Sequence, residues 1–228
     1  MNETCRSLGI EMELKIDILP TAQYRLWQEL GETPKNFVLY GGTALALRLG
    51  HRQSVDFDFF SSEPFEPNEL YKNIDYLQAS EKSQMSKNTL TCLVIRQDEV
   101  AKVSFFGGLS FARLSSPEII SNPSIAIASL ADLSATKIQV IQDRAEMKDY
   151  IDITELLNYF SLEQMLANAM AVFGKEFNPL LSLKALTYYQ DGDLPQLDEK
   201  IKQVLLQLVH QIDLSKLPQV TIQSSQLI

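Results

Sequence analysis

The residues with the clearest chemical potential are two aspartates, Asp56 and Asp58, in the run Val55-Asp56-Phe57-Asp58-Phe59. Polar and apolar residues alternate strictly along this run, so a strand here would place both carboxylates on one face. Two adjacent carboxylates raise each other's proton affinity unless a cation lies between them. Oxygen ligands completed by substrate phosphates are typical of Mg²⁺ sites. Taken alone, the pattern is compatible with a magnesium site or with a solvated strand face.

A glycine pair upstream favours the magnesium site. The apolar run Phe37–Tyr40 is typical of a buried strand, and Gly41-Gly42 ends it where the backbone turns sharply. We expect a helix over Thr43–Leu49, with Thr43 as its N-cap and Gly50 in the left-handed position that closes a helix. Free N–H groups at a helix N-terminus bind phosphate well. The whole unit, residues 37–60, therefore predicts a site for phosphate and metal.

The composition is that of an ordinary globular protein. With 228 residues, 45% hydrophobic and 21% charged, the chain can bury a sizeable core. No stretch approaches about 18 continuous apolar residues, and the first 20 residues lack the apolar segment of a signal peptide. We expect a cytoplasmic protein that does not enter a membrane. Cys5 and Cys92 have no Cys or His neighbours at ligand spacing, so both are expected to be plain thiols.

The net charge of −9 argues against broad nonspecific nucleic-acid binding, which depends on Lys and Arg neutralising phosphates. A local basic patch is still possible, because Arg48, His51 and Arg52 lie between the glycines and the aspartates. Scattered charges of this kind are usually solvated surface. They support an RNA partner only weakly.

The remaining pattern predicts an α/β (α+β) fold, a mixed sheet flanked by helices with a helical C-terminal part. We expect a core over residues 1–128 and a helical region over residues 129–228 that completes the active-site cleft. In the last helix, seven apolar residues are expected to belong to the core: Leu197, Ile201, Val204, Leu205, Leu208, Val209 and Ile212. The expected strands are 37–40, 55–59, 89–96, 100–106 and 125–128, and the expected helices are 21–31, 43–49, 68–77, 130–143, one from about 149, 161–173, 179–189 and 194–212.

Lys137 and Arg144 occupy an unusual place in the helix expected over residues 130–143. Both fall on the apolar stripe of that helix, at intervals of three and four residues. A lysine there could run along the stripe to reach solvent, or it could point at substrate phosphates in a cleft. Arg144 permits the same two interpretations.

Asp149 and Asp152 share the first turns of the next helical pattern. Acids at this position stabilise a helix through its dipole, so capping would explain either one. A catalytic role would require both helices to lie near Asp56. If they do, Lys137 and one of the two acids should face Asp56 and Asp58 across a cleft.

Together these motifs resemble those of the AbiEii/AbiGii-type nucleotidyltransferase toxin family, which belongs to the DNA polymerase β-like nucleotidyltransferases. The resemblance is carried by the segments GGT at 41–43, HRQSVDFDFF at 51–60, Lys137 and Arg144, and KDYID at 148–152, in the same order. It covers most of the chain, and the late segment LLSLKALTYYQDGD is similar to the C-terminal helices of that family.

The resemblance implies a toxin of a toxin–antitoxin system that transfers a nucleotidyl group from a nucleoside triphosphate (NTP). MenT-like members modify the 3′ ends of tRNA, so an RNA or protein hydroxyl is the implied acceptor and a cognate antitoxin a possible partner. The implied site residues are, for Mg²⁺ (two ions possible), Asp56 and Asp58; for the nucleotide, Gly41, Gly42, Thr43, Arg52, Lys137 and Arg144; and for the last acidic motif, Asp149 or Asp152.

One departure bears on activity. Polymerase β-like enzymes commonly place a third carboxylate on a neighbouring strand, but the matching run from 100 to 106 offers Lys102 and Ser104. A catalytically inactive nucleotide-binding or partner-binding module is therefore the alternative function. Two further enzyme classes use Asp-x-Asp, haloacid-dehalogenase-like phosphatases and nucleotide-sugar glycosyltransferases. The first should continue with Gly-Thr rather than Phe59-Phe60-Ser61, and the second gives no role to Gly41-Gly42 or Lys137.

Overall fold

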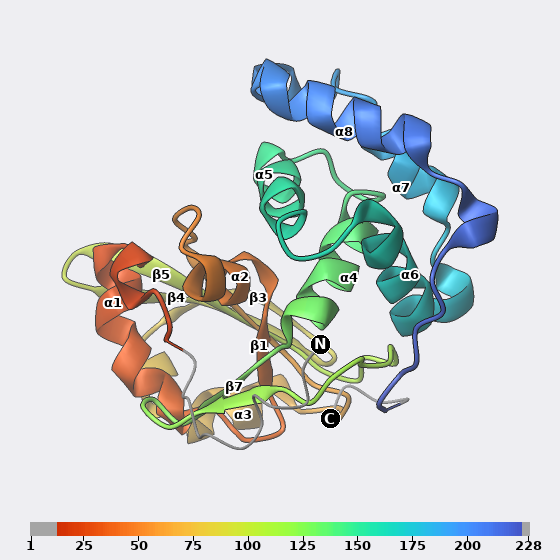
Figure 1. The fold of residues 1–228 in the computed structure, drawn as a ribbon. Helices are drawn as coiled ribbons and strands as arrows, with labels where there is room; N and C mark the ends of the chain where they lie inside the picture. Colours follow the sequence, from red (N-terminus) through yellow and green to blue (C-terminus); the bar gives the residue numbers. More distant parts are fainter. Residues whose placement is uncertain (1–12, 225–228) are drawn as a thin grey trace.

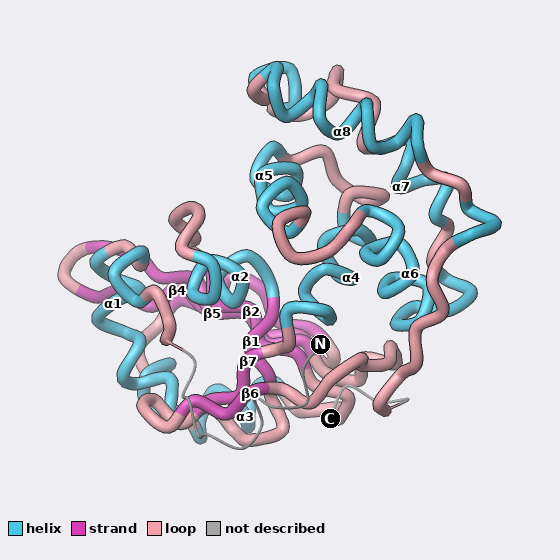
Figure 2. Tube along the Cα trace, viewed as in Figure 1, coloured by secondary structure: helices cyan, strands magenta, loops and turns pink. Residues whose placement is uncertain are grey.

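The computed structural model describes residues 13–224. Cys5 lies outside this range, and Cys92 is a buried free thiol. Within the described range, seven strands form one mixed sheet in the order β3-β4-β5-β2-β1-β7-β6 (Figures 1 and 2). The strands are β1 (Val38–Tyr40), β2 (Asp56–Phe60), β3 (Glu81–Ser86), β4 (Thr89–Arg96), β5 (Glu99–Phe106), β6 (Glu118–Ile120) and β7 (Ile125–Ile127).

Helices cover the sheet and then form a separate group. Helix α1 packs on β4 and β5, α2 packs on β1 and β2, and α4 contacts α2, α5 and α6. Figure 1 shows α4 to α8, in green to blue, gathered at one side of the sheet with no strand among them. The predicted fold class is thereby confirmed. The helices are α1 (Thr21–Trp27), α2 (Gly41–Leu49), α3 (Pro67–Asn73), α4 (Leu130–Val140), α5 (Met147–Leu156), α6 (Leu162–Phe173), α7 (Pro179–Ala185) and α8 (Glu199–Gln211).

Strand β2 is central because its alternation satisfies two environments. Phe57 and Phe59 are fully buried, whereas Asp56, Asp58 and Phe60 on the opposite face are partly exposed. The strand pairs antiparallel with β1 and parallel with β5, so both of its edges are hydrogen-bonded. The face that carries the aspartates is consequently fixed in register against its neighbours on both sides.

Helix α2 begins earlier than predicted. Gly41 has φ +73°, which turns the chain within one residue, and the helix starts there instead of at Thr43. Thr43 is therefore not the N-cap: its buried hydroxyl hydrogen-bonds the backbone carbonyl of Asp56, and its Oγ1 lies 2.9 Å from Ser54 Oγ. Gly50 does close the helix in the left-handed conformation, as predicted, with φ +68°.

The sheet has two strands that the sequence pattern did not predict, β3 and β6. Every residue of β3 is exposed, so neither face shows the alternation that marks a half-buried strand. Strand β6 is only three residues long and forms the opposite edge of the sheet. Both edge strands are defined by their pairing with β4 and β7 rather than by a hydrophobic pattern of their own.

The predicted core face of the last helix is only partly correct. Helix α8 begins at Glu199, after a short 3₁₀ turn, and Leu205 is its only fully buried residue. Leu197 before it is also buried, but Val204 is 43% exposed. The reason is position, because α8 lies at the outside of the helical group and contacts α5 there.

No helix in residues 13–224 has the length and apolar character needed to span a membrane.

Candidate active site

The parallel pairing of β2 with β5 builds the floor of the site. The register joins Asp56 to Lys102, Asp58 to Ser104 and Phe60 to Phe106. Because side chains alternate along a strand, these six residues share one face of the sheet. That face changes from charged to aromatic along its length. Lys102 Nζ lies 3.0 Å from Asp56 Oδ2, so a lysine stands where a third carboxylate was sought.

A cavity of about 710 Å³ opens over this floor. It is lined by residues from the sheet, from the loop before β2 and from α4 and α5. The five basic side chains outnumber the three acidic ones, which suits a polyanion that arrives with a divalent cation. The charged lining residues are Arg52, Asp56, Asp58, Lys102, Lys137, Arg144, Glu146 and Lys148.

The glycine pair allows the turn before α2 to lie against the charged groups of the site. A Cβ on Gly41 would lie 2.7 Å from Asp58 Oδ2, and one on Gly42 would lie 2.6 Å from Arg52 Nη2. Any side chain at either position would displace the carboxylate or the guanidinium. Gly42 also lines the cavity, so its backbone is accessible to a ligand.

The two aspartates of β2 form a site with unbalanced charge. Burial, followed by the negative charge of Asp56, raises the pKa of Asp58, and the nearby cations Lys102, Lys137 and Arg144 oppose this shift only in part. A divalent cation between the carboxylates would remove the repulsion. The donor set, two carboxylates open to a cavity that can admit phosphates, fits Mg²⁺. No cluster of three or more His, Cys, Asp or Glu side chains suited to a metal occurs within residues 13–224.

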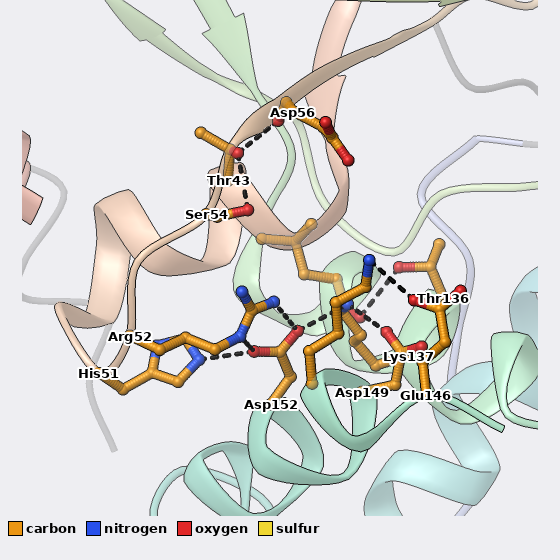
Figure 3. Close-up of polar contacts among 12 residues, drawn as sticks. Thr43, His51, Arg52, Ser54, Asp56, Thr136, Lys137, Glu146, Asp149 and Asp152 are labelled. Atoms are coloured by element: carbon orange, nitrogen blue, oxygen red, sulfur yellow. Dashed lines mark hydrogen bonds and ion pairs between the residues drawn. The ribbon is translucent and has the colours of Figure 1, made fainter. Parts of the chain in front are cut away.

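Asp152 has the opposite environment. Its side chain is fully buried and accepts hydrogen bonds from His51 Nε2 at 2.6 Å and from Arg52 Nε and Nη2 at 2.6 and 2.7 Å. Lys137 Nζ lies 2.6 Å from Asp152 Oδ2. Figure 3 shows Asp152 between the loop that carries His51 and Arg52 and the helix that carries Lys137. Burial would raise the pKa of Asp152, but the hydrogen bonds from His51 and Arg52 and the charge of Lys137 hold it well below its usual range.

Asp149 holds a second pair of cations in the same way. It is fully buried, it accepts a hydrogen bond from Lys137 Nζ at 2.7 Å, and it binds Arg144 through both carboxylate oxygens at 2.8 and 3.0 Å. The hydrogen bond from Arg144 and the charge of Lys137 outweigh burial and lower the pKa of Asp149. Lys137 Nζ thus lies between the two acids, and its side chain is only 5% exposed.

These contacts separate the sequence-predicted residues into two sets. Asp56, Asp58, Lys137, Arg52 and Arg144 line one cavity. The other set lies outside this cavity lining. Asp149 and Asp152 lie behind the basic residues and bind them, and the Thr43 hydroxyl is used within the protein. The Lys137 side chain does not run along the apolar stripe to reach solvent, because its amine ends on two buried carboxylates.

Two contributions were not assigned from the sequence, the hydrogen bond of His51 to Asp152 and the ion pair of Lys102 with Asp56. The signal for Lys102 was present, since it alternates with Ser104 and Phe106 as Asp56 does with Asp58 and Phe60. It required knowledge that the two strands are parallel neighbours. No local signal identified His51, because its partner lies 101 residues away in the chain.

Comparison with known proteins places the chain in a family. A family model described as "Nucleotidyl transferase AbiEii toxin, Type IV TA system" matches residues 25–220. An uncharacterised protein of Aquifex aeolicus (strain VF5) is 32% identical over 162 residues, which cover 69% of this chain and 75% of that protein.

Two solved structures share the fold. MenT4, a nucleotidyltransferase toxin from Mycobacterium tuberculosis H37Rv, superposes with a TM-score of 0.55 at 16% identity, covering 83% of this chain and 82% of its own. A protein from H. pylori solved as a candidate nucleotidyltransferase gives a TM-score of 0.51 at 16% identity, covering 85% and 93%. The chain therefore belongs to the AbiEii family of nucleotidyltransferase toxins of type IV toxin–antitoxin systems.

Proposed function

We propose that this nucleotidyltransferase uses Mg²⁺ to transfer a nucleotidyl group from an NTP to a hydroxyl group of RNA, with the 3′ end of tRNA as the first acceptor to test. The observation that carries the proposal is the shared cavity, which brings Asp56 and Asp58 together with Arg52, Lys137 and Arg144. Carboxylates for a divalent cation and basic residues for phosphates are the two requirements of phosphoryl chemistry.

In this proposal Asp56 and Asp58 hold Mg²⁺, which supplies positive charge to the phosphate oxygens when it is bound. A second ion would take its remaining ligands from the substrate and water, because Lys102 and Ser104 occupy the neighbouring strand positions. The test of fit is the charge imbalance at Asp58 described above. Within residues 13–224, Asp56 has Lys102 as its ion-pair partner, whereas the cations near Asp58 oppose the rise of its pKa only in part.

The basic side chains bind and orient the triphosphate. Arg52, Lys137 and Arg144 contact its oxygens from the wall of the cavity, and Gly41, Gly42 and Thr43 contribute backbone N–H groups at the start of α2. The acceptor oxygen then bonds to the α-phosphorus, the bond from this phosphorus to the β-phosphate oxygen breaks, and pyrophosphate leaves. The hydroxyl proton passes to solvent through the open cavity.

Asp149 and Asp152 act as positioning residues in this scheme. Each binds basic side chains from behind while those side chains line the cavity. Glu146 also pairs with Arg144 and with Lys148, so four basic side chains share three carboxylates and a net positive charge remains for the substrate. In this scheme both expected parts of the chain contribute to the site. Residues 1–128 supply the metal-binding carboxylates Asp56 and Asp58 together with Arg52, and residues 129–228 supply Lys137 and Arg144.

The test is transfer of label from each of the four α-labelled NTPs to total cellular RNA, with Mg²⁺ and purified protein. We expect labelled RNA with the wild type and none with Asp56→Ala or after chelation of the metal. A parallel reaction without RNA tests self-labelling of a protein hydroxyl. If wild type and Asp56→Ala give the same background with all four nucleotides in both reactions, the proposed activity is wrong.

One observation favours a second candidate, an inactive nucleotide-binding or partner-binding module. Lys102 already supplies a positive charge to Asp56 and leaves the third carboxylate position without an acid. Such a module would bind NTPs without transfer, and its effect on growth would be unchanged by Asp58→Ala. In either case, we propose a cytoplasmic location and a cognate antitoxin. Co-purification of the antitoxin from the native host would test the latter.

A further inference from the structure

A second cavity, of about 330 Å³, continues from the first one past Asp58. The two cavities share five lining residues: Gly42, Asp58, Phe106, Lys137 and Arg144. Their chemistry differs. The first contains most of the basic residues, whereas the second has four phenylalanines in its wall, of which the first has only Phe106. A single ligand with a charged end and a flat apolar end could therefore occupy both.

The aromatic wall is assembled from three separate parts of the chain. Phe60 and Phe106 are the last paired residues of β2 and β5, and their rings form a T-shaped contact with centroids 5.5 Å apart. Phe111 lies 5.1 Å from Phe173 of α6 and 6.2 Å from Phe60. All four rings are partly exposed, so they retain surface for a ligand. Aromatic side chains provide stacking surfaces for nucleobases.

Gln139 of α4 supplies a polar group at this aromatic wall. It lines the second cavity, and its buried Oε1 has no hydrogen-bond partner within the described part of the chain. A buried carbonyl oxygen without a partner is costly to a folded protein and is a feature that a ligand donor can relieve. The side-chain amide has both a donor and an acceptor, and rotation of the amide exchanges them. It can therefore match the edge of a base.

We propose that the aromatic cavity binds the base of the NTP and that Gln139 determines which base is accepted. The α-phosphate then lies at Asp58, where the cavities meet, with the β- and γ-phosphates toward Lys102 and Arg52 and the base between Phe111 and Phe106. The graded face of β2 and β5 gives this orientation, since it runs from charged to aromatic past Asp58. Amide side chains read bases through paired hydrogen bonds in this way. The inference rests on the proposed NTP substrate.

The experiment measures equilibrium binding of ATP, GTP, CTP and UTP by calorimetry, with Ca²⁺ replacing Mg²⁺ to suppress transfer, and of inorganic tripolyphosphate as a ligand without a base. Wild type should prefer one NTP. Gln139→Leu should weaken the binding of that NTP by about tenfold, because this is the discrimination that a paired amide contact provides. The affinities for the four NTPs should become similar. Tripolyphosphate affinity should be unchanged. Phe111→Leu should weaken the binding of all four NTPs by a similar factor and leave the affinity for tripolyphosphate unchanged.

Gln142→Leu is the matched control. Gln142 lies one turn further along, but it donates hydrogen bonds to Asn178 O and Ser182 Oγ and lines a different cavity. It should leave the order of the four NTPs unchanged. Gln139→Glu guards against loss of folding in the leucine variant, because it keeps the shape and the acceptor and loses the donor. It should therefore alter the NTP order rather than abolish binding.

The outcomes separate this inference from the proposed function. If wild type binds one NTP selectively through Gln139 but labels nothing, the base site is supported and the transfer reaction is not. The base assignment is overturned if wild type does not discriminate among NTPs, or if Gln139→Leu leaves their order intact. A change confined to the preference for the 3′-terminal nucleotide of RNA acceptors would also overturn it, since the cavity would then serve the acceptor.

Discussion

Two pairs of aspartates meet at the candidate active site, and their surroundings are opposite. Asp56 and Asp58 lie on a sheet face open to the cavity, and among residues 13–224 the only cation paired with either is Lys102, on Asp56. Asp149 and Asp152 are fully buried, and each binds at least two basic side chains. The pKa of Asp58 is raised, whereas the pKa values of Asp149 and Asp152 are lowered.

This contrast explains how one site can use four acids without conflict. A carboxylate that is already neutralised by buried cations contributes structure, because removing it would leave those cations unpaired. A carboxylate that repels its neighbour has a charge that only a ligand can balance. The α5 pair therefore organises the basic wall, and the β2 pair is available for a metal ion.

The sharpest test of the contrast is Asp58→Asn. Transfer should fall by more than about 100-fold, since even the outer partners of metal ligands typically contribute about 10- to 100-fold. Stability should be unchanged or higher, because the substitution removes the negative charge that repels Asp56. Labelling assays and urea unfolding measure the two effects. Full activity, or destabilisation as large as that of an α5 variant, would contradict the assignment.

Asp152→Ala should show the reverse balance. Its removal leaves Lys137, Arg52 and His51 without their shared acceptor, so the free energy of unfolding should fall by about 3–5 kcal/mol. Urea denaturation at neutral pH provides the measurement, with Asp58→Ala as the matched aspartate deletion. Equal stabilities for the two alanine variants would remove the distinction between the pairs.

The pH dependence of stability should follow the buried pair. The pKa values of Asp149 and Asp152 are lower in the folded protein than their usual value of 3.8, so the folded state binds fewer protons. Their contribution is present above that value and is lost as the pH falls below it through the folded pKa values. The difference in unfolding free energy between wild type and Asp152→Asn should therefore narrow below about pH 4. A difference in unfolding free energy that stays constant down to pH 2 would contradict this prediction.

The smallest expected effect concerns Lys102. The ion pair of Lys102 with Asp56 is partly exposed, at 41% and 26% of the two side chains, so it is worth about 1 kcal/mol or less. Lys102→Met should raise the affinity for Mn²⁺, used as a spectroscopic substitute for Mg²⁺, by up to about fivefold. Lys148→Met, which removes another cavity lysine that pairs with Glu146, is the control. Lower Mn²⁺ affinity in Lys102→Met would show that the lysine helps to hold the metal site.

The amino-acid sequence determined the local features of this protein. The alternation Asp56-Phe57-Asp58-Phe59 fixed which side chains share a face, because a strand has a period of two. Ser129 begins α4 through an equally local interaction, since its hydroxyl accepts a hydrogen bond from Asp132 N at 3.1 Å. Each of these depends on interactions within a few residues. Where no such local signal exists, as in the exposed strand β3, the pattern predicted nothing.

The tertiary structure decided what the charged residues do. The sequence left open whether Asp149 or Asp152 is the functional acid, and the structure gives both the same task of binding basic side chains. Their partners His51, Arg52 and Lys137 come from 12 to 101 residues away, and this distance carries no periodic signal. The roles of buried charges depend on which opposite charges share their low-dielectric surroundings, and only the folded chain brings those charges together.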